Sequence, residues 1–266
     1  MRRVIDLRYR ILGDDETERL YKREPGLANG YEKWCPTCDK SGSYRTPENI
    51  EVQCDCETQV ALFKHYAAAG IGTTFMRLDW ADYRGSEAIL SGLAKYEENR
   101  AEFVRRGMGI YLSGDIGTGK TMLANLVLKD MIKAGYTCFA TTFAQTIDMY
   151  TSGWTDRDDK AWFQRKFLNS QMLLLDDVGK ELRNTKLSLA ESTFDSILRQ
   201  RVTNGRPTFI TTNLDSSDLS EGYGRAILSL IREQSLEEVV TGEDYRPRAN
   251  ELRVDEVLKG ITRPVV

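Results

Sequence analysis

One eight-residue segment constrains the fold of this chain more than any other feature. Its residues are Gly114, Asp115, Ile116, Gly117, Thr118, Gly119, Lys120 and Thr121, which fit the pattern GxxxxGK[ST]. An apolar run over 108–113 precedes the segment, and apolar residues recur at helical spacing over 122–132. The segment therefore connects a buried strand to the N-terminus of a helix. Glycines there let backbone N–H groups turn toward an anion, and the helix dipole favours negative charge, so the loop is predicted to bind phosphate.

The phosphate loop implies a set of nucleotide contacts. All eight residues are predicted to surround the phosphates of ATP, with the Lys120 ammonium on the β- and γ-phosphates. The hydroxyl of Thr121 is predicted to bind Mg²⁺.

A second apolar strand ends in two carboxylates. Residues 172–175 are Met-Leu-Leu-Leu, and Asp176 and Asp177 follow them. In an open α/β sheet, ligands bind beyond the carboxyl ends of the strands. Asp176 is therefore predicted to hold Mg²⁺, directly or through water, and Asp177 to orient or deprotonate the attacking water.

A third strand ends in small polar side chains. Residues 209–213 read Phe-Ile-Thr-Thr-Asn. In a sheet of this order the strand lies beside the phosphate-loop strand, so Asn213, or Thr212, is predicted to contact the γ-phosphate or the water. The alternative is an ordinary loop opening into Asp215.

The pattern of alternating strands and helices predicts an α/β fold with a parallel sheet flanked by helices. Strands are predicted at 108–113, 136–141, 171–175, 207–211 and 238–241, and helices at 58–69, 86–105, 120–134, 144–151, 157–168, 186–203 and 223–234. The predicted domains are a Cys-rich head (1–57), a helical connector (58–72) and a nucleotide-binding domain (73–266). No apolar run approaches the roughly 20 residues of a membrane span, and we expect a cytosolic protein with reduced thiols.

Four of the five cysteines lie within 22 residues: Cys35, Cys38, Cys54 and Cys56. Two closely spaced thiol pairs separated by a polar loop predict a four-coordinate structural Zn²⁺ site. Disulfides and unliganded thiols are the alternatives, and His65 is a possible replacement ligand, although a position on the following helix is favoured. Cys138 is predicted to be a small core residue.

The charge of the head bears on its partner. Residues 1–60 contain ten Lys and Arg against twelve Asp and Glu. A module that binds phosphates is expected to be basic. We therefore favour protein binding by the head over DNA binding.

Together, the stretches GDIGTGKT, LLLDDVGKE and FITTNLD and the preceding Cys cluster resemble the AAA+ replicative-helicase loaders of the DnaC/DnaI type. The resemblance implies a P-loop AAA+ core with little or no C-terminal lid, an N-terminal zinc-binding domain, and a Mg²⁺-dependent ATPase stimulated by assembly and DNA. It also implies binding of a hexameric replicative helicase through the head, loading onto single-stranded DNA during replication, self-association, and a bacterial or phage-infected cytoplasm.

The resemblance further implies an arginine finger that contacts ATP of a neighbouring subunit. Arg225 is the first candidate and Arg232 the second. The alternative for either residue is a solvated helix surface. A finger supplied in trans makes hydrolysis depend on assembly, because it stabilises charge in the transition state.

Two further stretches carry hypotheses. Over 150–167, aromatic residues including Tyr150 and Trp154 interleave with Arg157, Lys160 and other basic residues, a combination that suits single-stranded DNA. The alternative is an amphipathic helix with its aromatic side chains in the core. Adenine contacts are assigned to 75–83.

Two other classes of protein share a phosphate loop. Transposition helper ATPases of the IstB kind share the core but usually lack a Cys-rich head, and they act on duplex DNA. A small-molecule kinase needs an acceptor pocket and an arginine-rich lid near the loop, and the sequence has no matching segment.

Overall fold

A computed structural model describes residues 12–30, 34–152, 156–180 and 187–266. The chain divides into two compact units. Within the described residues, the sheet unit lies between Tyr83 and Asp244, and the Cys unit comprises the residues from 12 to 82 and Tyr245–Val266. The predicted division at residues 57 and 72 stays a prediction, and the structure groups residues 245–266 with the N-terminal part of the chain.

The sheet unit contains the predicted parallel sheet. Its strands lie in the order β4-β5-β6-β3-β7, and every neighbouring pair is parallel. The bounds are β3 Gly109–Ser113, β4 Cys138–Thr142, β5 Met172–Val178, β6 Thr208–Thr212 and β7 Ser235–Val239. The last strand begins three residues earlier than predicted. The phosphate-loop strand β3 pairs with β6, as predicted, so the ends of β3, β5 and β6 lie at one edge of the sheet.

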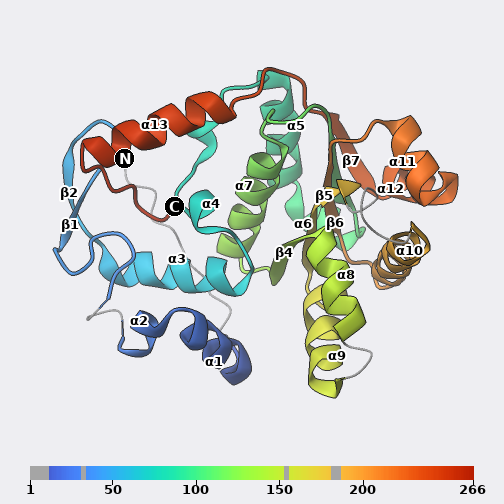
Figure 1. The fold of residues 1–266 in the computed structure, drawn as a ribbon, viewed down its shortest axis with the longest axis horizontal. Helices are drawn as coiled ribbons and strands as arrows, with labels where there is room; N and C mark the ends of the chain where they lie inside the picture. The colour runs from blue at the N-terminus through green and yellow to red at the C-terminus, as the bar shows by residue number, and fades with distance from the viewer. Residues whose placement is uncertain (1–11, 31–33, 153–155, 181–186) are drawn as a thin grey trace. The chain divides into compact units, whose positions relative to one another are not determined.

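One face of the sheet is covered by α7 (Lys120–Lys133) and α5 (Glu87–Glu98), which lie on the opposite side from α10, α11 and α12 (Figure 1). The ring of Tyr96 on α5 packs edge-on against Phe209 of β6, with the ring centroids 5.6 Å apart. The single helix predicted over 86–105 is two helices, because Asn99 (φ −103°, ψ 18°) leaves the helical conformation before α6 (Arg100–Arg105).

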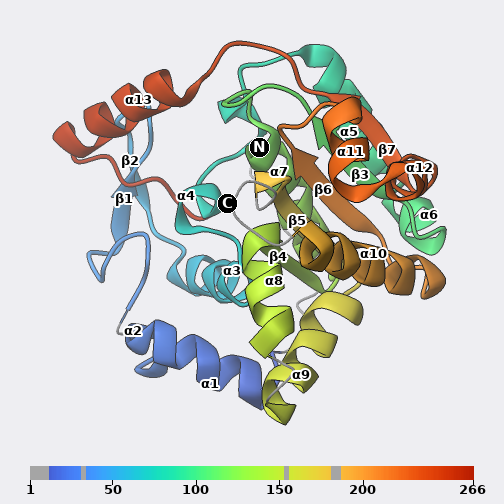
Figure 2. The same cartoon turned by 45° about the vertical axis from the view of Figure 1, so that its right-hand side comes forward.

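The other face buries the larger aromatic cluster. Figure 2 shows α8, α9 and α10 side by side on this face. The helices are α8 (Phe143–Ser152), α9 (Arg157–Phe163) with a π-turn (Gln164–Leu168), α10 (Leu187–Thr203), α11 (Ser216–Tyr223) and α12 (Arg225–Glu233). The predicted helix at 223–234 begins later, because Gly224 (φ 86°) separates α11 from α12.

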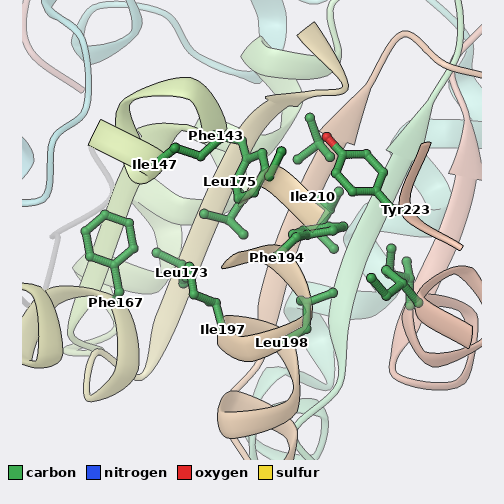
Figure 3. Packing of buried hydrophobic residues seen from close by; sticks show 14 of the residues in the cluster. Phe143, Ile147, Phe167, Leu173, Leu175, Phe194, Ile197, Leu198, Ile210 and Tyr223 are labelled. Atoms are coloured by element: carbon green, nitrogen blue, oxygen red, sulfur yellow. The ribbon is translucent and has the colours of Figure 1, made fainter. Parts of the chain in front are cut away.

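Side chains from strands and helices meet in this cluster (Figure 3). Phe194 of α10 lies against Phe143 of α8 and Tyr223 of α11, with ring centroids 5.0 and 4.9 Å apart. Leu173 and Leu175 of β5 point to the same face of the sheet, as expected of residues two positions apart in a strand. Burial of this cluster holds β5, and with it the two aspartates, against the helices.

The Cys unit contains a β-hairpin and several helices. Its elements are α1 (Asp14–Arg23), α2 (Pro25–Ala28), β1 (Ser43–Arg45), β2 (Glu51–Gln53), α3 (Cys56–Ala68), α4 (Thr73–Met76), a 3₁₀ turn (Trp80–Asp82) and α13 (Arg246–Leu258). Helix α3 corresponds to the predicted connector, whereas α13 was not predicted. Within the described residues, no helix has the length and apolar character needed to cross a membrane.

Candidate functional site

The phosphate loop occupies the predicted position between β3 and α7. Gly117 and Gly119 have φ values of 81° and 97°, in the left-handed region that favours glycine. A Cβ atom on Gly117 would collide with the Asp244 carboxylate, and one on Gly114 would collide with the carbonyl oxygen of Val240. The loop therefore needs its glycines for both backbone conformation and close packing.

Lys120 begins α7 and is nearly buried, with 5% of its surface exposed. Its ammonium donates hydrogen bonds to the carbonyl oxygens of Gly114 (2.9 Å) and Asp115 (2.6 Å). The hydroxyl of Thr118 donates to the Asp115 carbonyl oxygen at 2.9 Å. The positive charge of Lys120 is thus held inside the loop, at the N-terminus of α7. The ammonium and the helix dipole both favour a bound anion there.

Asp176 lies next to the loop, near the carboxyl end of β5. Its Oδ1 accepts hydrogen bonds from the hydroxyls of Thr121 (2.9 Å) and Thr211 (2.6 Å). Burial raises the pKa of Asp176, while these two hydrogen bonds and the Lys120 ammonium act in the opposite direction. The structure brings Thr121 and Asp176 together, as the predicted Mg²⁺ site requires, since Mg²⁺ prefers oxygen ligands.

Asp177 differs from Asp176 in backbone and in partners. The pairing of β5 with β6 shifts between Leu175 and Val178, and Asp177 within this bulge has a left-handed φ of 57°. The side-chain amide of Asn213 donates to Asp177 Oδ1 at 3.1 Å. The bulge therefore turns the carboxylate of Asp177 toward Asn213, at the end of the neighbouring strand β6.

Thr211 is the residue of this site that sequence reasoning missed. Its hydroxyl donates to Asp176 and accepts the backbone N–H of Asp177 at 3.0 Å, so one side chain bridges both aspartates. Thr212 instead donates to the carbonyl oxygen of Val178 at 2.6 Å. The sequence signal for this residue was the pair of adjacent threonines at the end of the strand. Because successive side chains of a strand point to opposite faces, only one of the two can face the aspartates.

Comparisons with known proteins agree with this geometry. The family model for the IstB-like ATP binding protein matches residues 77–251. The chain belongs to the IstB-like ATP-binding protein family. An IS21-like insertion-sequence ATP-binding protein of Bacteroides fragilis is 29% identical over 101 residues, covering 38% of this chain and 50% of the relative.

DnaC, the replicative helicase loader of Escherichia coli K12, is 22% identical over 186 residues, covering 68% of this chain and 74% of DnaC. A crystal structure of the DnaC helicase loader has a TM-score of 0.58 at 23% identity, covering 64% of this chain and all of that chain. The resemblance read from the motifs is therefore confirmed, and so is the AAA+ fold. The chain spans only half of the length of the Bacteroides relative.

The two candidate arginines of this family member have different surroundings. Arg225 is exposed at the start of α12, and among the described residues it has no ion-pair partner. Arg232 lies 3.2 Å from Glu237 and donates to the hydroxyl of Ser216 at 2.8 Å. Arg232 is thus bound within its own chain, whereas Arg225 is available to another molecule.

The four head cysteines converge on one point. The Sγ atoms of Cys35 and Cys54 are 3.7 Å apart, those of Cys38 and Cys56 are 3.5 Å apart, and all four lie within 4.8 Å of one another. Zn²⁺ with Zn–S bonds of about 2.3 Å holds tetrahedral sulfurs about 3.8 Å apart, so the cluster fits this metal. None of these four cysteines forms a disulfide bond.

Neighbouring groups alter the acidity of these thiols. Burial raises the pKa of Cys38, but hydrogen bonds from the Gly42 backbone and the other thiols lower it to about 7. Burial raises the pKa of Cys54. Several thiolates can coexist here only with a cation between them. In the described part of the chain, His65 lies on α3 and does not belong to this metal-binding cluster.

The segment 150–167 has the buried aromatic side chains of an amphipathic helix, and its binding of single-stranded DNA stays a prediction. Phe163 and Phe167 are buried and stacked, with ring centroids 4.2 Å apart, as in an amphipathic helix. Arg157 and Lys160 are exposed and line a cavity of about 650 Å³ with Tyr150, Gln164, Ser196 and Gln200. Trp154 lies outside the described residues.

Of the stretch assigned to adenine, Tyr83 belongs to the sheet unit. Its ring lies against Gly119, and a Cβ atom added to Gly119 would be 3.0 Å from the ring. An aromatic side chain therefore flanks the phosphate loop at the start of this unit.

Proposed function

We propose that this chain hydrolyses ATP with Mg²⁺ and uses the cycle to load a ring-shaped replicative helicase onto single-stranded DNA. The observation that supports this most is the meeting of two groups at the carboxyl ends of the strands, in a chain that matches DnaC over 186 residues. The Lys120 ammonium is held inside the phosphate loop. Beside it, hydrogen bonds through Thr211 connect Thr121, Asp176 and Asp177.

The residues of the network have distinct proposed roles. The loop Gly114–Thr121 binds the phosphates, with the Lys120 ammonium neutralising their charge. The oxygens of Thr121 and Asp176 hold Mg²⁺, which polarises the γ-phosphate when bound. Asp177, oriented by Asn213, positions the attacking water.

Assembly of several subunits completes the proposed site. Arg225 reaches the ATP of a neighbouring subunit. Both candidate arginines are exposed, and the ion pair of Arg232 with Glu237 supports Arg225 for this role. A finger from a neighbour stabilises charge in the transition state, so hydrolysis depends on self-association.

The head is proposed to bind Zn²⁺ and the helicase. Cys35, Cys38, Cys54 and Cys56 provide four sulfur ligands with spacing that fits the metal. Such a closed site is structural, since it leaves no position for a substrate. The near balance of charge in residues 1–60 supports a protein partner. The proposed location is the cytoplasm.

Single-stranded DNA is proposed to bind at the cavity beside α9. Arg157 and Lys160 provide positive charge, and Tyr150 provides an aromatic ring. This combination neutralises phosphates and stacks bases without requiring a base sequence.

A second candidate is a transposition helper ATPase acting on duplex DNA. The IS21-like relative of Bacteroides fragilis favours it. The Cys cluster favours the loader, since it provides a partner-binding module ahead of the nucleotide site.

The test compares turnover and loading by the full chain. ATP hydrolysis is measured with single-stranded or duplex DNA, and the host's replicative helicase is assayed for unwinding of a forked substrate coated with single-strand binding protein. A loader is stimulated by single strands and increases unwinding. Stimulation by duplex alone, with no effect on the helicase, would establish the helper instead. The Lys120→Ala variant is the control for both readouts.

A further inference from the structure

The Cys cluster and the segment Ile261–Val266 share one buried side chain, Gln59. Gln59 lies on α3, three residues after Cys56. Its Oε1 accepts hydrogen bonds from the Thr37 hydroxyl (2.6 Å) and from the backbone N–H of Val265 (2.6 Å). Its Nε2 donates to the carbonyl oxygen of Val265 at 3.2 Å. The amide of Gln59 therefore pairs with the Val265 backbone while holding the loop between two cysteines.

Arg77 makes a second connection between the same two segments. Its guanidinium donates to the carbonyl oxygen of Pro36, which lies between Cys35 and Cys38, and to that of Arg263. Burial lowers the pKa of Arg77. Its hydrogen bonds to carbonyl groups therefore compensate for lost hydration, and losing either carbonyl would leave a partly buried charge with fewer partners.

The end of the segment is held by α3 and α4. The backbone N–H of Val266 donates to the carbonyl oxygen of Met76 at 3.0 Å, and the Tyr66 hydroxyl donates to the main-chain oxygen of Val266 at 3.0 Å. Val265 has only 1% of its surface exposed. The segment is thus docked by hydrogen bonds and by burial of one apolar side chain.

We propose that metal binding at the four cysteines controls the docking of the segment 261–266. This inference rests on the proposed Zn²⁺ site. A metal ion ties Cys35 and Cys38 to Cys54 and Cys56, and so fixes Pro36 and Thr37 relative to the start of α3. Loss of the metal by chelation removes that constraint. Thr37 and Pro36 then no longer hold Gln59 and Arg77 in position for the segment.

The consequence concerns the connection between the two compact units. Residues 245–266 follow directly on Asp244, the last residue of the sheet unit, and belong to the Cys unit. Metal loss is therefore expected to release residues 261–266 without unfolding the sheet. Removal of the metal would therefore change how firmly residues 261–266 are held.

The test measures hydrogen exchange of the full chain by mass spectrometry, after zinc content is established by a colorimetric assay. On chelation, exchange in the peptide containing 261–266 is expected to rise by about tenfold or more, while peptides from β3 and β6 do not change. The variant Gln59→Ala is expected to release the segment while retaining zinc. Gln53→Ala, at an exposed glutamine on β2 of the same unit, is the matched control and should leave exchange unchanged.

The outcomes separate the two proposals. Zinc bound at one equivalent, with equal protection of 261–266 before and after chelation, would overturn the coupling and leave the metal site intact. Absence of bound zinc from the purified chain would overturn both. Exchange that rises equally in β3 would show general unfolding and would also overturn the coupling.

Discussion

Replacing Thr211 with valine tests whether one hydroxyl organises both aspartates. Valine keeps the branched shape and removes hydrogen bonds of 2.6 Å to Asp176 and 3.0 Å from the N–H of Asp177. Thr211 is only 1% exposed, so water does not replace them. A hydrogen bond to a charged group contributes about 1.5–3 kcal/mol and an unsatisfied buried N–H costs about 1–3 kcal/mol. Because the two are not additive, we expect a loss of about 2–4 kcal/mol in the free energy of unfolding.

The same substitution is expected to weaken Mg²⁺ binding. The Thr211 hydrogen bond lowers the pKa of Asp176, so its loss raises that pKa further and reduces the negative charge available to the metal. Stability is measured by urea unfolding, and Mg²⁺ affinity by titrating the binding of a fluorescent ATP analogue. We expect the Mg²⁺ concentration at half-saturation to rise severalfold.

Thr212→Val is the matched control. The Thr212 hydroxyl donates to the Val178 carbonyl oxygen at 2.6 Å and accepts the Leu214 N–H at 3.0 Å, so it bonds to backbone alone. Both variants should lose stability, and only Thr211→Val should need more Mg²⁺. Identical Mg²⁺ titrations for the two variants would refute the assigned role of Thr211.

Four further variants have expected outcomes. Lys120→Ala should abolish ATP binding in calorimetry, because the proposed role of this ammonium, which lies inside the loop, is to neutralise phosphate charge. Arg225→Ala should keep ATP affinity but lower assembly-dependent turnover by about 10³-fold or more, as loss of an arginine finger does. Arg232→Ala should affect turnover much less, since Arg232 is paired within its own chain. Burial and the neighbouring Asp130 raise the pKa of Glu97 to about 8 from an ordinary 4.5, so the folded state binds more protons and stability falls as pH rises from about 5 to 8. Glu97→Gln should flatten that decline, as measured by urea unfolding across the pH range.

Each of these expectations has a result that would contradict it. Unchanged ATP affinity in Lys120→Ala would contradict the loop assignment. Full turnover in the assembled Arg225→Ala protein would move the finger elsewhere. Glu98→Gln, at the exposed neighbour of Glu97, should keep the wild-type pH dependence. A decline with pH in Glu97→Gln as steep as in the wild type would show that another group carries the effect.

Local sequence was sufficient to predict the strand, loop and helix of the proposed phosphate site. The strand, glycine loop and helix around Lys120 follow from spacing and backbone freedom over a few neighbouring residues, which are properties of local sequence. The same holds for the buried strand before Asp176 and for the four thiols of the head. Helix breaks at Asn99 and Gly224 were less predictable, because apolar periodicity continues across both.

Contacts between distant residues required the tertiary structure. Thr211 bridges the two aspartates because β6 lies beside β5 and the bulge at Asp177 changes the register. Gln59 meets Val265 across 206 positions of the chain, a separation that no local pattern reports. Helix α13 was not predicted, although Val254, Val257 and Leu258 recur in it at helical spacing, and the structure leaves these three side chains exposed.

The amino-acid sequence by itself therefore determined the chemistry of this protein: a phosphate loop, two carboxylates and four thiols, each encoded within a short stretch. Which hydroxyl bonds to the carboxylates, which of the two arginines forms an ion pair within its own chain, and what holds the residues after 260 were decided only by folding. The physical reason is that hydrogen bonds form wherever packing brings donors and acceptors within about 3 Å, whatever their separation along the chain.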